Sequence, residues 1–365
     1  MMPFRSIAMA LALVAATPAQ TTLKDAFRDF FRIGAALNPG QFTGKDAAGA
    51  ALVAAQFNTI TPENDLKWGL IHPTPDGYRF ERADRYVEFG EKNHMFIVGH
   101  CLVWHQQTPA WVFQDQDREA LLKRMRDHIL TVVGRYKGRI NGWDVVNEAL
   151  DENGKLRQSP WLRIIGEDYI AKAFEYAHEA DPKAELYYND YSLENEAKRK
   201  GAIELIRKLK AQGVPIAAVG LQGHDNMNWP EVSQQEAAIT AFRALGIKVN
   251  ITELDVDVLP SVRSRQTADV SATAAGGANS NPYTAGLPDA LERALAKRYA
   301  DLFTVFLKHR DAITRVTFWG VTDRDSWLNN FPVKGRTNYP LLFDRQGKPK
   351  PAFDSVLQAA RAAAR

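Results

Sequence analysis

The sequence predicts a (β/α)8 barrel, the TIM barrel architecture, as a single domain, and two observations support this prediction. Short apolar segments rich in β-branched and aromatic residues alternate with longer amphipathic segments along the chain. The apolar character of the short segments is continuous rather than alternating, which is typical of parallel strands covered on their outer side. Eight such segments occur, at residues 31–37, 57–64, 95–104, 139–148, 184–190, 216–224, 247–255 and 315–320.

Helical signals fill the gaps between these strands. The clearest helices are expected at residues 118–136, 167–182, 194–213 and 288–310. The first has an apolar period of 3.6 residues after Asp117, and the third ends at Gly213. A doubly wound open sheet is the alternative, but it usually carries a glycine-rich phosphate turn after its first strand. Residues 31–40, FRIGAALNPG, contain no GxGxxG pattern, so the closed barrel is favoured.

The start of the chain is typical of a secretory signal peptide. Arg5 precedes an apolar run over residues 7–16, and small residues lead to Ala19. We expect cleavage near Ala19 and export of the (β/α)8 domain, residues 20–365, to the periplasm or the medium. The alternative is that residues 1–19 form a disordered or helical N-terminal extension.

Composition limits the kinds of partner. The chain has 365 residues, 46 of them basic and 43 acidic, with a formal net charge of +3 and a single cysteine, Cys101. No intramolecular disulfide can form, so stability must come from a hydrophobic core. No cluster of Lys and Arg suggests a nucleic-acid or membrane patch, and no membrane-spanning stretch follows the leader. We expect a monomer that binds an uncharged or weakly acidic partner, neither nucleic acid nor membrane.

Residues 261–288 interrupt the alternation of strands and helices. They are small, polar and rich in Gly, Ala and Ser, and they lie between the seventh strand and its helix. We expect a long, mobile loop there. Both an inert insertion and a functional lid fit this composition.

Polar and aromatic side chains gather where the predicted strands end, which is where a barrel carries its active site. A lone His or Trp at such a place is more often structural, but seven of the eight strands contribute. The residues are Glu63, Asn64, Lys67, Trp68, His100, Trp104, His105, Gln107, Asn147, Glu148, Asn189, Asp190, Gln222, His224, Glu253, Asp255 and Trp319.

This inventory suits glycoside hydrolysis better than other chemistries. No GxSxG serine and no nucleotide fingerprint appear. His100 and His105 are not part of an HExxH motif, and the scattered carboxylates leave a metal site only as a weak alternative, so no metal or cofactor is expected. Cleaving an acetal needs a protonated carboxyl for the leaving oxygen and an ionised one for the oxocarbenium-like centre. Trp104, Trp319 and Trp327 can pack against sugar rings.

Two segments resemble the catalytic-strand motifs of glycoside hydrolase family 10, the (β/α)8 xylanases: WDVVNEA at 143–149 and ITELDV at 251–256. Further segments resemble that family's blocks in the same order, and together they run from Phe31 to the final helix. They are TPENDLKW (61–68), GHCLVWHQQTPAW (99–111), YYNDY (187–191), VGLQGH (219–224), TFWGVTDRDSW (317–327) and NYPLLFD (338–344).

The resemblance implies a retaining endo-β-1,4-xylanase that cleaves internal bonds of xylan or xylo-oligosaccharides. It makes Glu148 the general acid/base and Glu253 the nucleophile that forms a covalent glycosyl-enzyme, with carboxyl groups roughly 5 to 5.5 Å apart. His224, held by Asp255, would hydrogen-bond Glu253 and keep it ionised. Asn147 would contact the sugar 2-hydroxyl at the cleavage point.

The resemblance also implies a set of substrate-binding residues. Those for the non-reducing side and the cleavage point are Glu63, Asn64, Lys67, His100, Trp104, Gln107, Gln222, Trp319 and Trp327. Those toward the leaving group are Tyr188, Asn189 and Tyr191. Crowding by Trp327 or Gln107 would favour xylan over cellulose. A β-1,4-glucanase or mixed β-glycanase remains an alternative, as does a non-catalytic carbohydrate-binding barrel.

Overall fold

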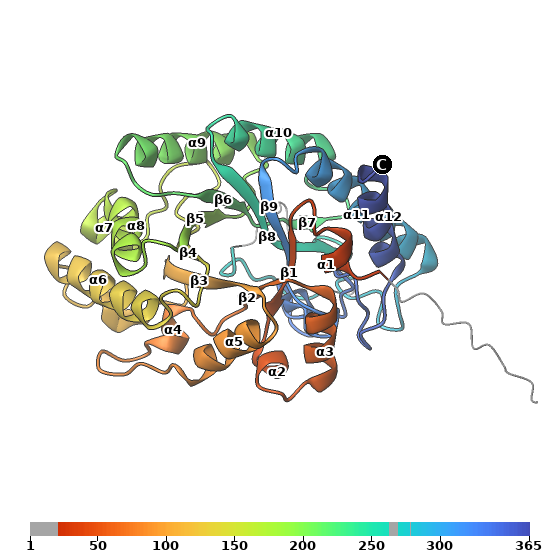
Figure 1. Cartoon of the computed structure of the whole chain (residues 1–365), viewed down its shortest axis with the longest axis horizontal. Coiled ribbons are helices and arrows are strands. Elements are labelled where there is room, and N and C mark those ends of the chain that lie inside the picture. Colours follow the sequence, from red (N-terminus) through yellow and green to blue (C-terminus); the bar gives the residue numbers. More distant parts are fainter. Residues whose placement is uncertain (1–20, 263–268, 278) are drawn as a thin grey trace, which may run out of the picture.

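The computed structural model describes residues 21–262, 269–277 and 279–365, so the predicted signal peptide lies outside the described residues. Parallel strands form a closed barrel surrounded by helices (Figure 1). A pairing between β6 and β8 closes the sheet, and the predicted (β/α)8 fold is confirmed. The barrel strands are β1 (Arg32–Leu37), β2 (Thr59–Pro62), β3 (Phe96–Trp104), β4 (Gly142–Asn147), β5 (Glu185–Asp190), β6 (Ala218–Leu221), β8 (Lys248–Asp257) and β9 (Ile313–Phe318).

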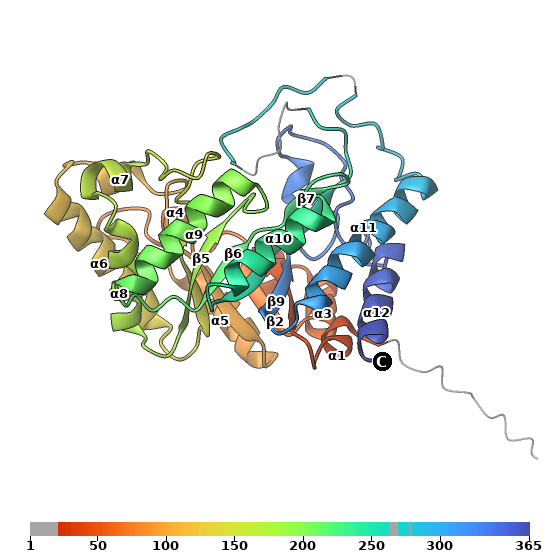
Figure 2. The same ribbon diagram turned by 90° about the horizontal axis from the view of Figure 1, so that it is seen from above.

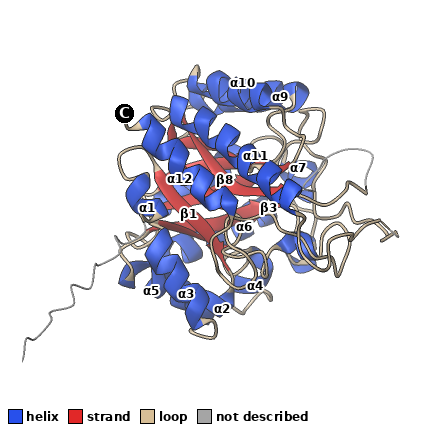
Figure 3. Ribbon diagram, turned by 90° about the vertical axis from the view of Figure 1, so that its right-hand side faces the viewer, coloured by secondary structure: helices blue, strands red, loops and turns tan. Residues whose placement is uncertain are grey.

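Helices cover the outside of the barrel, and longer loops gather at one of its ends (Figure 3). The four clearest predicted helices are confirmed, with ends shifted by a few residues: α6 (Arg118–Arg135), α8 (Tyr169–Ala180), α9 (Glu196–Ala211) and α11 (Asp289–Lys308). The others are α1 (Leu23–Ala26), α2 (Pro39–Phe42), α3 (Ala47–Gln56), α4 (Trp68–Ile71), α5 (Glu81–Lys92), η1 (Ala110–Phe113), α7 (Pro160–Ile165), α10 (Val232–Arg243), η2 (Trp327–Asn329) and α12 (Pro351–Ala363). Among the described helices, none is long and apolar enough to cross a bilayer.

The predicted strand at residues 216–224 is divided in two. β6 ends at Leu221, and Gly223, with φ of 76°, turns the chain before the short strand β7 (His224–Asn226). A left-handed backbone of this kind favours glycine because it has no Cβ. β7 pairs in parallel with the end of β8, and this register places His224 opposite Asp255.

The barrel interior is more polar than the continuous apolar strands suggested. Arg315 on β9 and Asp144 on β4 are each 2% exposed or less, and their side chains lie 3.7 Å apart. The guanidinium of Arg315 also lies 4.7 Å from the ring centroid of Tyr187. Asp144 accepts a hydrogen bond from His100 Nδ1 at 2.9 Å, so this interior pair positions a side chain at the mouth of the barrel.

Gly201 on α9 is a position where packing leaves no room for a side chain. A Cβ atom there would lie 2.0 Å from the carbonyl oxygen of Gly154, which is backbone and cannot rotate away. We predict that Gly201→Ala lowers the free energy of unfolding by about 1–3 kcal/mol, the usual cost of overpacking. Gly134 on α6 has open space around it, so Gly134→Ala should instead stabilise the protein by roughly 0.5–1 kcal/mol. Urea unfolding of both variants measures the difference, and equal effects would contradict the packing argument.

Candidate active site

A cleft of about 330 Å³ lies at the carboxyl ends of the barrel strands. It brings together residues from six strand ends and from the segments after β8 and β9. Thirteen of its lining residues are predicted site residues, and the other one is Val270. The lining comprises Glu63, Asn64, Lys67, His100, Trp104, Gln107, Asn147, Glu148, Gln222, His224, Glu253, Val270, Trp319 and Trp327.

Glu148 follows β4 in a left-handed backbone conformation, with φ of 57°, which is uncommon for a residue with a side chain. Its backbone N–H donates to the carbonyl of Asn189 at 2.9 Å. The carboxyl accepts from Trp104 Nε1 at 2.8 Å and from Gln222 Nε2 at 3.0 Å. Burial raises the pKa of Glu148 to about 7, and the negative charge of Asp190 adds to this. This group can therefore carry a proton near neutral pH.

Glu253 lies on β8 and is as buried as Glu148, at 5% and 4% exposure. Its carboxylate accepts from Asn189 Nδ2 at 2.8 Å and from His224 Nε2 at 3.1 Å. Burial alone would raise the pKa of Glu253, but the hydrogen bond from His224 and the influence of His100 bring it below the ordinary value. Glu148 and Glu253 are thus equally buried, but their pKa values shift in opposite directions because their neighbours differ. Glu148 lies near the carboxylate of Asp190, whereas Glu253 accepts a hydrogen bond from the imidazolium of His224.

His224 links Glu253 to the rim of the cleft. Its Nδ1 lies 3.1 Å from Asp255 Oδ1, and the other oxygen of Asp255 accepts from Trp327 Nε1 at 2.7 Å. Burial alone would lower the pKa of His224, but Asp255 and Glu253 raise it to about 10. The ring is therefore protonated at neutral pH and donates to both carboxylates. Trp327 is fixed by the same chain of contacts.

Amide side chains connect the carboxyl groups of Glu148 and Glu253. The Nδ2 amide of Asn189 donates both to Asn147 Oδ1 at 2.9 Å and to Glu253 Oε1 at 2.8 Å. Asn147 Nδ2 lies 3.3 Å from Glu148 Oε1. Thr252 donates to Asn189 Oδ1 at 2.6 Å, which fixes the orientation of that amide. This network sets the relative position of the carboxyl groups without a direct contact between them.

Lys67, Glu63 and Trp319 complete the lining of the cleft beside Trp104 and His100. Lys67 donates to Asn64 Oδ1 at 3.0 Å, and its ammonium lies 4.9 Å from the ring of Trp104. Burial raises the pKa of Glu63, although Lys67 opposes this shift. Trp319 packs edge-on against His100, with ring centroids 5.4 Å apart. Apolar ring faces beside fixed donors and acceptors form a surface that can bind a sugar.

The structure does not bring every predicted substrate-binding residue into this cleft. Tyr188 lies on β5, is fully buried and does not line the cleft, and its hydroxyl donates to Asp190 at 2.5 Å. Asn189 is also fully buried and acts on Glu253 and Asn147 rather than on the open space. Tyr191 lies beside the cleft, where it lines a neighbouring hollow with Arg157. Asp255 reaches the cleft only through His224 and Trp327.

Sequence reasoning missed other residues that shape the site. Val270 comes from the segment after β8, where no periodic pattern marks individual positions. Thr252 lies in the ITELDV segment next to Glu253, and its hydrogen bond to Asn189 was not predicted. Arg157 donates to the backbone oxygen of Glu148 at 3.2 Å from a segment outside any strand. Only the proximity of Thr252 to Glu253 in the sequence could have indicated one of these roles.

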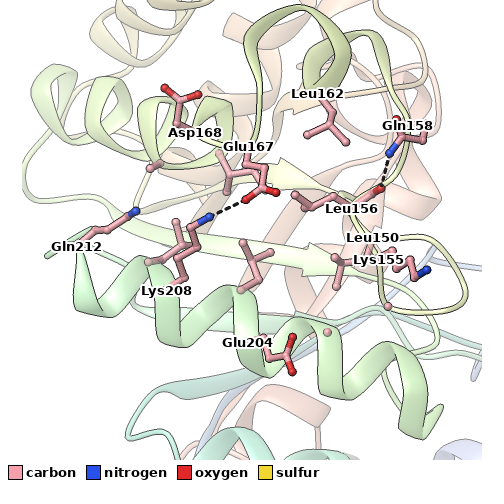
Figure 4. Close-up of a pocket in the computed structure, with 16 residues that line it drawn as sticks. Leu150, Lys155, Leu156, Gln158, Leu162, Glu167, Asp168, Glu204, Lys208 and Gln212 are labelled. Carbon is pink, nitrogen blue, oxygen red and sulfur yellow. Dashed lines mark hydrogen bonds and ion pairs between the residues drawn. The ribbon is translucent and has the colours of Figure 1, made fainter.

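A larger cavity, about 690 Å³, lies outside the barrel between α8, α9 and the chain after β4. Its lining combines leucine and other aliphatic side chains with an equal number of polar and charged ones, and Lys208 and Glu167 pair across it (Figure 4). No lining residue is aromatic, and no carboxyl of the central network reaches it. Within the described part of the chain, no group of three His, Cys, Asp or Glu side chains could hold a metal ion. The buried carboxyls and the tryptophan rings line the smaller cleft, and that cleft is the candidate active site.

A (β/α)8 barrel with two buried carboxyls of opposite pKa shift at its strand ends is the arrangement of a glycoside hydrolase. The model of glycosyl hydrolase family 10 matches residues 22–359, and the chain belongs to this family.

Known proteins of similar sequence and structure agree with this assignment. The chain is 45% identical to endo-1,4-beta-xylanase A of Xylanibacter ruminicola, over 96% of each sequence. It matches a GH10 endoxylanase from a sugarcane soil metagenome with 51% identity and a TM-score of 0.90, covering 92% of this chain and 99% of that one. It also matches an intracellular xylanase of Thermoanaerobacterium saccharolyticum, solved as a mutant with xylotriose, with 37% identity and a TM-score of 0.81, covering 93% and 99%.

Proposed function

We propose that this protein is a retaining endo-β-1,4-xylanase. The observation that carries the proposal is the pair Glu148 and Glu253: equally buried, joined through Asn147 and Asn189, and shifted in pKa in opposite directions. One carboxyl is suited to give a proton and the other to remain a nucleophile, which is the division of labour of a retaining glycosidase.

The proposed reaction has two steps. Glu253 attacks the anomeric carbon while Glu148 gives its proton to the leaving oxygen, so the glycosidic bond breaks as the glycosyl-enzyme bond forms. Glu148, now ionised, then removes a proton from a water molecule. As that proton passes to Glu148, the water oxygen attacks the same carbon and the bond to Glu253 breaks, so both carboxyls regain their starting forms and two inversions give net retention. His224, protonated and hydrogen-bonded to Glu253, stabilises the carboxylate at the start and at the end.

Measuring the anomer that the enzyme first releases tests this mechanism. We expect proton NMR of a fresh digest of xylohexaose to show the β-anomer before mutarotation. Initial α-anomer would mean inversion and would rule out the covalent role of Glu253.

The substrate class rests on the tryptophan rings and the hydrogen-bonding side chains that line the cleft, and on relatives named as xylanases. A β-1,4-glucanase would share the same carboxyl pair, and a relative 39% identical is named exoglucanase XynX. We therefore compare kcat/KM on xylan and on carboxymethyl cellulose, with xylan expected to be strongly preferred. Preference for cellulose would overturn the substrate proposal, and binding of xylan without release of reducing ends would favour the non-catalytic barrel.

Export through the leader at residues 1–19 remains part of the proposal, tested by N-terminal sequencing of secreted protein.

The pKa shifts predict the pH dependence of kcat/KM. Activity should fall at low pH as Glu253, whose pKa is lowered, takes up a proton. It should fall at high pH as Glu148 loses its proton with a pKa of about 7. Trp104 donates to Glu148 and so favours the ionised form. Trp104→Phe removes this donor, and the alkaline limb should move to higher pH.

The matched control for this variant is Trp111→Phe. Trp111 also loses an indole hydrogen bond, to the carbonyl of Pro73, but it lies outside the cleft lining. We expect its alkaline limb to stay where it is in the parent protein. An alkaline limb that Trp104→Phe leaves unchanged, or moves to lower pH, would contradict the assignment of that limb to Glu148.

A further inference from the structure

Lys198 is a buried cation that the proposed reaction does not use. It lies on α9, which runs along the outside of β5 (Figure 2), and its side chain is fully buried. Its ammonium pairs with Asp190 Oδ1 at 2.8 Å and lies 3.4 Å from the ring centroid of Tyr191. A lysine is rarely buried unless its charge is paired, and the carboxylate of Asp190 provides that pair. Lys198 does not line the cleft, so it has no direct contact with a substrate there.

Asp190 connects this ammonium to the residues around Glu148. Its Oδ2 accepts from the backbone N–H of Leu150 at 3.4 Å, two residues after the acid/base. Its carbonyl oxygen accepts from the backbone N–H of Gln222 at 3.1 Å, and the side chain of Gln222 donates to Glu148. Asp190 thus contacts both the chain that follows Glu148 and the strand end that carries one of its hydrogen-bond donors.

The same pair places two charges close to the acid/base. Burial is the main cause of the raised pKa of Glu148, and the negative charge of Asp190 is the next largest cause. Charges that are shielded from solvent are weakly screened. The ammonium of Lys198 opposes the effect of Asp190, because it lies 2.8 Å from that carboxylate. A change at Lys198 should therefore reach Glu148 without any contact with the substrate.

Other titratable side chains face Glu148, Asp190 or Lys198 from the elements around them. Burial raises the pKa of the Cys101 thiol on β3 and of the hydroxyls of Tyr169 on α8, Tyr188 and Tyr191, so these groups are uncharged at neutral pH. Burial also lowers the pKa of His105 to about 4 and raises that of Glu194, which favours their neutral forms. Arg157 and Glu253 stay charged, but both act inside the site: one donates to the backbone of Glu148 and the other is the nucleophile.

We propose that Lys198 and Asp190 are positioning residues for Glu148: the buried pair holds the chain beside the acid/base, and the balance of its two charges determines the pH at which Glu148 gives up its proton. The inference rests on the proposed function and deepens it. Loss of the ammonium makes the surroundings of Glu148 more negative and favours its protonated form, whereas loss of the Asp190 charge favours its ionised form. A pair with only a structural role would not produce two opposite effects.

The alkaline limb of kcat/KM on xylopentaose reports the proton on Glu148. Lys198→Met should move this limb to higher pH by about one pH unit, and Asp190→Asn should move it to lower pH by about one pH unit, as expected when a nearby charge is removed. In Lys198→Met the charge of Asp190 is kept, because Tyr188 and the backbone N–H groups of Tyr191 and Leu150 still donate to it.

A double variant keeps the test decisive if a single one does not fold. Removal of one partner leaves a buried charge unpaired, whereas removal of both does not. Lys198→Met combined with Asp190→Asn should have its alkaline limb between those of the two single variants. If Lys198→Met does not fold, the double variant is compared with Asp190→Asn, from which it differs only at residue 198. Its limb should then lie at the higher pH of the two.

The matched control is Lys350→Met. Lys350 also pairs with a buried aspartate, Asp323, at 2.9 Å, and neither side chain lines the cleft. Urea unfolding should show a loss of stability, but the alkaline limb should stay at the pH of the parent protein. If the limb stays in place in Lys198→Met and Asp190→Asn, moves in the same direction in both, or moves equally in Lys350→Met, the pair does not act on Glu148 and the inference fails. A parent protein that does not cleave xylopentaose would instead overturn the proposed function, and the inference with it.

Discussion

Glu253→Ala should reduce hydrolysis of xylan by a factor on the order of 10^5 to 10^6, comparable to removing the nucleophile of another hydrolase. The reason is geometric and electrostatic: Glu253 is the carboxyl that Asn189 and protonated His224 hold ionised. No other described carboxylate shares these two donors. Initial rates on xylan, with reducing sugar as the readout, measure the effect.

Azide distinguishes a missing nucleophile from a damaged fold. The azide anion fits the space left by the Glu253 carboxylate and attacks the face of the sugar ring that Glu253 would attack. Glu253→Ala with azide should therefore form the α-glycosyl azide from an aryl β-xylobioside. Glu175→Ala is the matched control, because Glu175 is an exposed residue of α8 that pairs with Lys172 on the outside of the barrel. It should retain parent activity. A β-azide product from Glu253→Ala would place the nucleophile elsewhere.

The order of strands and helices could be predicted because it depends on local periodicity. Continuous apolar segments predicted each barrel strand to within a few residues, and a signal such as the 3.6-residue period after Asp117 predicted α6. The interruption at Gly223 was not predicted, because a positive φ at one glycine leaves no trace in apolar periodicity. That turn matters, since it allows β7 to pair with β8 and places His224 opposite Asp255.

The position of Tyr188 outside the cleft lining has a simple physical origin. Successive side chains on a strand point to opposite faces, so Tyr187 and Asn189 face the barrel interior while Tyr188 and Asp190 face the helices. Asp190 accordingly meets Lys198 of α9 at 2.8 Å, with both side chains fully buried. The segment YYNDY therefore contains residues from both faces of β5. Only the alternation of side chains along the strand shows which of them face the barrel interior.

Long-range electrostatics could not be read from the sequence. The pKa of Glu148 depends on its burial and on Asp190, which lies on another strand. Arg315 was included only as part of a strand, yet it lies inside the barrel beside Asp144 and supports His100. A buried ion pair of this kind requires a partner from a distant segment, and a single sequence gives no sign of which segments meet.

Glu148→Ala is predicted to separate the two steps of the reaction. Hydrolysis of xylan should fall by roughly 10^3 to 10^4, because a sugar leaving group needs the proton that Glu148 provides. An aryl xylobioside with an acidic phenol needs no such proton, so its first step should be much less impaired and should show a burst of phenol before slow turnover.

Azide should accelerate that turnover, because it needs no general base, and it should attack the glycosyl-enzyme from the face that water uses. The product is then the β-glycosyl azide, the opposite anomer from that of Glu253→Ala. The two variants therefore test each other. Identical azide anomers would show that Glu148 and Glu253 do not lie on opposite faces of the sugar, whereas opposite anomers follow only if one carboxyl attacks the ring and the other serves the leaving group and the water.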